Sequence, residues 1–255
     1  MGLRGQVAAL FLIAALALNP FSAKAADDPW LNWQSELNRD HPLAGRIWSV
    51  GTRQLVNLGD LIRALVEADF RLLGETHDNP DHHRLQAYLI EAIATAGRRP
   101  VVVFEMIDRT QEPALNAYLA RPGASAAGLG EAVDWADAGW PDWRIYQPIA
   151  EVALRAGLKI AFGNEARAFV RGTVFGGTPL PADRATALGL DIPLEDRLVR
   201  DLEAEIATSH CDMLPQSAIK PMVQAQRLRD AVMADRLLQA ASGDGAVLIA
   251  GSGHV

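Results

Sequence analysis

Four short and almost continuously apolar runs recur along the chain, at residues 70–73, 101–104, 158–162 and 246–250. Each run is rich in β-branched or large apolar residues and is bounded by Gly or Pro, as buried strands are. Amphipathic stretches with helical spacing separate the runs. Continuous apolar strands that alternate with helices predict an α/β fold, in which helices flank a mostly parallel central sheet.

The helices between the runs are predicted from their apolar period and their end signals. After Pro80 the apolar residues recur with helical spacing, Asp78 or Asn79 can cap the start, and Gly97 follows the end. Residues 147–156 and 218–241 show similar patterns. We interpret residues of about 106–146 and 171–242 as helical insertions, which form a lid subdomain over the carboxyl ends of the strands.

The first 25 residues differ from the rest of the chain. Arg4 precedes an apolar run over residues 7–18, and small residues stand at Ala23 and Ala25. This pattern is typical of a cleaved signal peptide over residues 1–25, and the run is short for a membrane span. We expect cleavage near Ala25, an N-terminal extension over residues 26–44 and one domain over residues 45–255. No cysteine follows the run, so a periplasmic or secreted protein is expected rather than a lipoprotein.

Composition and charge narrow the classes of function. The chain has 255 residues, of which 49% are hydrophobic, and this is enough for one sizeable core. Its net charge is −7 and no basic stripe is visible, which argues against nucleic-acid binding. Cys211 is the single cysteine, so the chain contains no partner for it in a disulfide.

Each apolar run leads into polar residues. In an open parallel sheet, ligands bind outside the carboxyl ends of the strands. We therefore expect one site to collect the following residues from the four strand ends: Glu75, His77, Glu105, Asn164, Arg167 and His254.

Two Gly-x-x-His turns, at residues 74–77 and 251–254, stand out among these ends. Together with Glu105, His77 and His254 are a reasonable donor set for a divalent transition metal. Glu75 or Glu105 could then serve as the general base of a hydrolase. The alternative is that each histidine only locks its own turn.

Two further histidines begin the helix after the first strand. His82 shares a helix face with apolar residues, so we expect it to point inward and to support the site. His83 lies on another face and is interpreted as a solvated helix start.

An aromatic-rich segment, residues 135–146, could hold a flat apolar ligand beside this polar pocket. Tyr146 has a phenol that could ligate ferric iron. Trp143 would pack against such a ligand, and Arg144 and Arg167 would bind its carboxylates. The alternative is that the segment forms the packed core of the lid.

Six segments in order resemble one family: GETHDNPDHHRLQ, VVVFEM, YQPIAEVA, SHCDMLP, QAQRLRDAVMA and GSGHV. Over residues 45–255 the chain is similar to ChaN-type haem-binding uptake proteins of the Tiki/TraB-like group. The resemblance implies an α/β sheet with a helical subdomain, in an exported protein. It also implies two haems stacked face to face in a homodimer, with iron held by a tyrosine with histidine support, and a link to outer-membrane uptake machinery.

The same resemblance leaves a second reading open. The Tiki branch implies a metal-dependent protease, whose Gly-x-x-His pair and glutamate match His77, His254 and Glu105. The main hypothesis is an exported haem-binding protein of iron or haem uptake or storage, with His82, Trp143, Arg144, Tyr146 and Arg167 around the haem. The alternative is a metal-dependent hydrolase, and whether the chain is an enzyme stays open.

Overall fold

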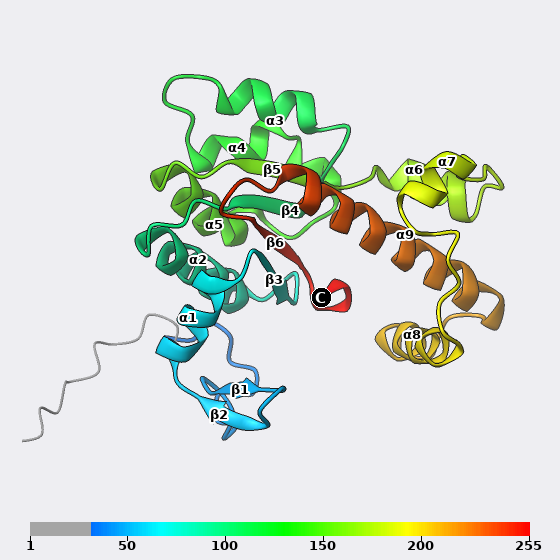
Figure 1. Cartoon of the computed structure of the whole chain (residues 1–255), viewed down its shortest axis with the longest axis horizontal. Coiled ribbons are helices and arrows are strands. Elements are labelled where there is room, and N and C mark those ends of the chain that lie inside the picture. Colours follow the sequence, from blue (N-terminus) through cyan, green and yellow to red (C-terminus); the bar gives the residue numbers. More distant parts are fainter. Residues whose placement is uncertain (1–31) are drawn as a thin grey trace, which may run out of the picture.

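The computed structural model describes residues 32–255, so the predicted signal peptide lies outside the described residues (Figure 1). Its centre is a parallel sheet with the strand order β3-β6-β4-β5. The strands are β3 (Phe70–Glu75), β4 (Val101–Asp108), β5 (Ile160–Asn164) and β6 (Ala246–Gly251). The predicted fold class is confirmed. All four predicted runs are strands, and each continues past its predicted end.

Helices cover both faces of this sheet. The helices α2 (Pro80–Thr95) and α5 (Trp143–Arg155) pack on one face, and α9 (Gln216–Ala240) packs on the other (Figure 1). The chain crosses the sheet in one direction from β3 through β4 to β5, and then returns to β6. Because the crossovers are right-handed, helices that connect strands in one direction across the sheet lie on one face, and helices that connect them in the reverse direction lie on the other.

Side chains along the strands alternate between these two faces. Leu73 and Phe104 belong to the apolar cluster under α2 and α5, whereas Val103 belongs to the cluster under α9. The alternation continues into the polar strand ends. It turns Glu75 toward α2 and α5, and it turns Glu105 toward α9.

The start and end of α2 follow the predicted signals. The side chain of Asn79 accepts a hydrogen bond from the backbone N–H of Asp81, and Pro80 occupies the first turn. The helix ends at Thr95, and Gly97 follows with φ of +89°. This left-handed conformation is costly for residues that carry a Cβ.

Helical insertions occur in the two predicted regions. The first begins after Asp108 rather than near residue 106, because β4 is longer than expected, and it holds α3 (Glu112–Leu119), α4 (Ala126–Ala132) and η2 (Trp135–Ala138). The second holds α6 (Arg167–Val174), α7 (Ala182–Ala187) and α8 (Asp196–Ser209) before α9. These helices pack against α9 in small apolar clusters of their own (Figure 1).

A small N-terminal unit was not predicted. It consists of the antiparallel pair β1 (Ile47–Ser49) and β2 (Gln54–Val56), followed by α1 (Leu58–Glu67). The strands are too short and too exposed to leave a clear apolar pattern. Within residues 32–255, no helix is long and apolar enough to cross a membrane.

Candidate functional site

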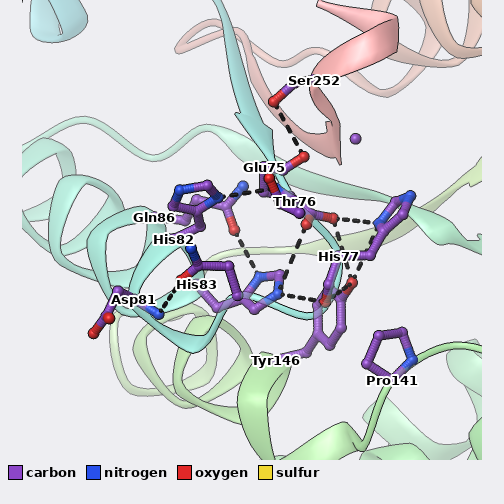
Figure 2. Close-up of polar contacts among 12 residues, drawn as sticks. Glu75, Thr76, His77, Asp81, His82, His83, Gln86, Pro141, Tyr146 and Ser252 are labelled. Atoms are coloured by element: carbon purple, nitrogen blue, oxygen red, sulfur yellow. Dashed lines mark hydrogen bonds and ion pairs between the residues drawn. The ribbon is translucent and has the colours of Figure 1, made fainter. Parts of the chain in front are cut away.

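A buried polar network lies beneath the first Gly-x-x-His turn (Figure 2). The carboxylate of Glu75 is completely buried, and its Oε1 lies 2.6 Å from Nδ1 of His77. The hydroxyl of Tyr146 lies 3.3 Å from the same Oε1 and 3.2 Å from the carbonyl oxygen of His77. The hydrogen bond to Glu75 raises the pKa of His77 despite the opposing effect of burial.

His83 supports this turn from inside the protein. Its ring is fully buried and lies 3.9 Å from the ring of Tyr146, measured between centroids. Its Nε2 is 3.0 Å from the carbonyl oxygen of His77, and its Nδ1 is 3.1 Å from Oε1 of Gln86. The prediction that His83 is a solvated helix start was wrong, because α2 packs this face of its first turn against α5.

His82 holds the turn from the other side. Its Nδ1 accepts a hydrogen bond of 2.9 Å from the backbone N–H of Thr76. Burial, followed by the nearby His83, lowers the pKa of His82. His82 lines a cavity of about 950 Å³ between the start of α2 and residues 33–45. It therefore faces a different cavity from the one at the ends of β4 and β5.

The second Gly-x-x-His turn has its own network on the α9 face. Glu105 accepts a 2.8 Å hydrogen bond from the backbone N–H of Gly251, and its Oε1 lies 3.3 Å from Nε2 of His254. The other ring nitrogen of His254 lies 2.6 Å from Oδ1 of Asp230. Burial alone would lower the pKa of His254, but the bonds to Asp230 and Glu105 outweigh it and raise this pKa to about 9.

The two turns approach each other at Gly251. A Cβ atom at this position would lie 3.0 Å from Nε2 of His77 and 3.8 Å from Oε2 of Glu105. A residue with a Cβ at this point would press on the imidazole, which would have to shift by a few tenths of an ångström. The parallel strand ends therefore bring His77, Glu105 and His254 together, as the sequence predicted.

The structure does not support the predicted metal centre at His77, His254 and Glu105. Within residues 32–255, no three His, Cys, Asp or Glu side chains are placed to hold one metal ion. His254 uses both ring nitrogens for carboxylates, and His77 turns its Nδ1 to Glu75 on the opposite face of the sheet.

A cavity of about 570 Å³ opens at the carboxyl ends of β4 and β5, and His77 is not among its lining residues but contacts one of them, Trp140. Trp140 lines it and lies 4.9 Å from the ring of His77, and the guanidinium of Arg167 lies 5.0 Å from the ring of Trp140. Arg229 of α9 also lines the cavity, and makes no hydrogen bond or ion pair with another described residue. Burial lowers the pKa of Arg229.

Charge is unevenly distributed around this cavity. The cations Arg167 and Arg229 come from α6 and α9. Five carboxylates also line it, on β4, at the η2 side and at the end of β5: Glu105, Asp108, Asp134, Asp137 and Glu165. Glu165 is paired with Arg109 and Arg184. An anionic group would therefore be attracted to the α6 and α9 side.

Comparison with known proteins decides the family. A model of haem-binding uptake proteins, Tiki superfamily, ChaN, matches residues 61–255. The chain belongs to this ChaN family. The resemblance predicted from the sequence is confirmed.

Two solved structures are similar to this ChaN-family chain. One is described as cofacial haem binding to ChaN of Campylobacter jejuni; its TM-score is 0.65 at 23% identity, and the match covers 81% of this chain and 79% of that chain. The other, the type III effector HopBA1, gives a TM-score of 0.43 at 12% identity over 76% of this chain and 71% of that chain. The first supports the fold, and the second is too weak to support an inference. No curated protein matches the chain.

The aromatic residues predicted to hold a ligand in this ChaN-family chain are core residues. Tyr146 is 0% exposed, and burial raises the pKa of its hydroxyl. Trp143 is buried, and its indole N–H donates to the carbonyl oxygen of Ala126. Both positions fit the alternative that this segment is a packed core. In this conformation neither side chain presents a surface to a ligand.

The two predicted cations of the chain differ in position. Arg167 lines the cavity, whereas Arg144 is exposed and forms an ion pair with Asp142, which lowers the pKa of Asp142 to about 2. Arg144 is not among the residues that line the cavity. Sequence reasoning missed Arg229, and it included Trp140 only as one aromatic residue of the segment 135–146. Gly139 and Pro141 mark a loop around Trp140. Because loop side chains are more often exposed than those inside a helix, this position could have singled out Trp140 as the residue that lines the cavity.

Proposed function

We propose that this chain binds haem in the cavity beside His77, with Nε2 of His77 as the iron ligand. Membership of a family of haem-binding uptake proteins supports haem as the bound molecule. The observation that carries the assignment is the state of the imidazole. Its Nδ1 is anchored to Glu75, its Nε2 has no hydrogen-bond partner among the described residues, and its side chain is 36% exposed.

The donor chemistry of His77 fits haem. A histidine that binds a metal usually donates its other ring N–H to a carboxylate or carbonyl, which fixes the tautomer and the ring orientation. The bond between His77 and Glu75 has this form. Haem, when bound, would supply an iron atom that an imidazole nitrogen can ligate.

The residues that line the cavity suit the rest of the haem group. Trp140 offers an aromatic side chain beside the imidazole of His77. Arg167 and Arg229 offer guanidinium groups to the two propionates, which are carboxylates. The propionates would then lie on the α6 and α9 side, away from Asp134 and Asp137.

The three tyrosines of the chain are less suited to ligate the iron in this cavity. Tyr146 is enclosed beneath His77. The hydroxyl of Tyr118 is bonded to Ser125 in the first insertion. Tyr88 lines a cavity on α2 with residues 91–96 and does not line the cavity beside Trp140. Histidine ligation therefore replaces the tyrosine ligation that the family resemblance implied.

The wider role is part of the same proposal. The Campylobacter jejuni protein is described as binding haem cofacially, and we propose the same stacked arrangement between two copies of this chain. The signal-like pattern of residues 1–25 supports export to the periplasm, as a soluble protein that acts in haem or iron uptake together with outer-membrane machinery.

A haemin titration read by visible absorption tests the proposal. The purified protein is expected to give a saturable Soret shift, which His77→Ala abolishes or weakens by about tenfold or more. His210→Ala is the matched control, since His210 is exposed at the end of α8. No saturable shift in the parent protein would refute haem binding. If His77→Ala keeps the Soret shift and His82→Ala loses it, the haem would bind instead in the cavity that His82 lines.

The arginines allow a second test of the same pocket. Arg229→Ala is expected to weaken haemin binding by about tenfold, because a guanidinium–carboxylate pair in a partly buried site is lost. Arg144→Ala is expected to leave the affinity unchanged, since Arg144 is paired with Asp142 at the surface. Equal effects of the two substitutions would contradict the placement of the propionates.

A further inference from the structure

The hairpin of β1 and β2 stands apart from the central sheet, at the end of the molecule beyond α1 (Figure 1). Its strands pair in antiparallel register, with Ile47 opposite Val56 and Trp48 opposite Leu55. Side chains alternate along each strand, so these two pairs lie on opposite faces of the hairpin. Ile47 and Val56 are half-buried, whereas Trp48 is 55% exposed and Leu55 is 52% exposed.

The exposed face of the hairpin carries an apolar patch, which consists of Trp48, Val50 and Leu55. Val50 follows Trp48 by two residues, opens the turn between the strands and is 80% exposed. The three side chains expose apolar surface on the order of 300 Å². This surface adds nothing to the core and is unfavourable in water, so a partner that covers it would stabilise the hairpin.

Two arginines border this patch. Arg46 precedes Trp48 by two residues, and Arg53 lies in the turn. Both side chains are exposed, and neither makes a hydrogen bond or ion pair with another described residue. Residues 41–57 contain no Asp or Glu, although the whole chain has a net charge of −7. The hairpin is therefore a cationic region of an acidic protein, and it complements an anionic surface.

We infer that the hairpin binds the surface of a membrane that contains anionic phospholipids, with the apolar patch inserted among the headgroups. Tryptophan favours this interface, because its ring is apolar and its indole N–H can donate to polar groups there. The indole N–H of Trp48 has no hydrogen-bond acceptor among the described residues. Arginine lays its apolar stem along lipid and its guanidinium against phosphate, which suits Arg46 and Arg53.

The size of the patch favours lipid over a protein partner. A stable protein–protein interface buries roughly 800 Å² on each side, well above the area that these three side chains expose. Lipid headgroups rearrange around a small protrusion, so a few apolar side chains beside cations are enough for attachment. The patch is also separate from the cavity at the ends of β4 and β5, because no residue of the hairpin lines that cavity.

Cosedimentation with vesicles tests the inference. The expected mature chain, residues 26–255, is used, because the apolar run of residues 7–18 could itself bind lipid. Its affinity for vesicles of equimolar phosphatidylcholine and phosphatidylglycerol is expected to exceed that for phosphatidylcholine alone by about tenfold or more. The preference is expected to shrink as the salt concentration rises.

Substitutions in the patch test where the lipid binds. Trp48→Ala and Val50→Asp are each expected to weaken binding to the mixed vesicles by about tenfold. Leu238→Ala is the matched control, since Leu238 is 67% exposed on α9, and it is expected to leave binding unchanged. Trp48→Phe keeps an aromatic ring, so it is expected to bind but to lose the blue shift of tryptophan emission that insertion causes.

Substitutions of the arginines test the charge. The double variant Arg46→Gln, Arg53→Gln is expected to lose about tenfold or more in affinity for the mixed vesicles and little for phosphatidylcholine. The matched control is Arg171→Gln with Arg200→Gln, because these two arginines are also exposed and have no ion-pair partner among the described residues. Equal losses in the two double variants would contradict the placement of the lipid at the hairpin.

Three other results would overturn the inference. These are no binding to either kind of vesicle, equal binding to both kinds, and binding that Trp48→Ala and Val50→Asp leave unchanged. Sedimentation velocity without vesicles adds a separate check. A dimer that Val50→Asp dissociates would show that a second copy of the chain covers the patch, against the inference. Haemin is absent from these assays, so their outcome does not depend on the proposed function.

Discussion

The two Gly-x-x-His turns have the same sequence pattern and opposite environments. His77 binds one carboxylate through Nδ1 and leaves Nε2 without a partner, whereas His254 binds carboxylates through both nitrogens. The side chain of His77 is 36% exposed and that of His254 is 8% exposed. The first turn can therefore offer a nitrogen to a ligand, and the second turn is a closed ion-pair network.

The difference arises from the partners that each face of the sheet supplies. The first turn rests on the buried layer of α2 and α5, where His83 and Tyr146 support it from inside. The second turn meets α9, whose Asp230 is 41% exposed and reaches the ring from the solvent side. The Gly-x-x-His pattern does not by itself make a histidine available to ligate a bound group. A ring nitrogen without a hydrogen-bond partner is needed as well. Four substitutions or conditions test this comparison.

The largest effect is expected from removal of the internal support of the first turn. His83→Ala deletes a fully buried ring and leaves the carbonyl oxygen of His77 and the side chain of Gln86 without this partner. The free energy of unfolding, measured by urea denaturation, is expected to fall by about 3 kcal/mol. His210→Ala, at an exposed position, is the control and should change it by less than about 0.5 kcal/mol. A loss below about 1 kcal/mol for His83→Ala would contradict this role.

The next largest effect is a dependence of stability on pH at the second turn. The pKa of His254 rises from 6.5 to about 9 on folding, so its stabilisation is complete below pH 6.5 and is lost as the pH rises through 9. We expect a contribution of about 2 kcal/mol, after allowance for the exposure of Asp230.

Urea denaturation between pH 6 and pH 10 measures this contribution, with Asp230→Asn as the comparison. The gap in stability between the parent and this variant is expected to narrow as the pH rises. A gap that stays constant over this range would show that His254 is not charged in the folded protein.

A smaller effect is expected from the hydroxyl that links Glu75 to the first turn. Tyr146→Phe keeps the buried ring and removes the hydrogen bonds to Glu75 and to the carbonyl oxygen of His77. The free energy of unfolding should fall by about 1 kcal/mol. A loss of about 3 kcal/mol or more in urea denaturation would mean that the ring itself moves, and the comparison would need a redetermined structure.

The smallest effect is expected at the solvent side of the second turn. Gln226 donates to the carbonyl oxygen of Gly253, and it is only partly buried. Gln226→Ala should change the free energy of unfolding by no more than about 0.5 kcal/mol. A loss similar to that of His83→Ala would erase the difference between an internally supported turn and an externally supported one.

Much of the fold could be predicted from local patterns. The four apolar runs became the four strands of the sheet, and the cap at Asn79 and the glycine at Gly97 marked the limits of α2. The rule that parallel strands present their carboxyl ends at one edge placed His77, Glu105 and His254 together. These features depend on residues close in the sequence, or on one general rule of topology.

The roles of the individual side chains depended on packing between distant elements. His83 rather than His82 is buried, because α5 brings Tyr146 against that face of α2. Trp143 points into the core while Trp140 lines the cavity, because α5 begins at Trp143 and the preceding loop is left at the sheet edge. A helical pattern gives the spacing of residues on a face, but it does not say which face a partner will cover.

By itself, the sequence determined the strands, the main helices and the residues that gather at the carboxyl edge, because these follow from periodicity, caps and strand direction. The tertiary structure alone decided which imidazole nitrogen is free. The free nitrogen depends on the face of the sheet to which Glu75 and Glu105 point, and on whether α5 or α9 lies opposite. Those contacts join residues far apart in the chain, and only the folded packing brings them within hydrogen-bond distance.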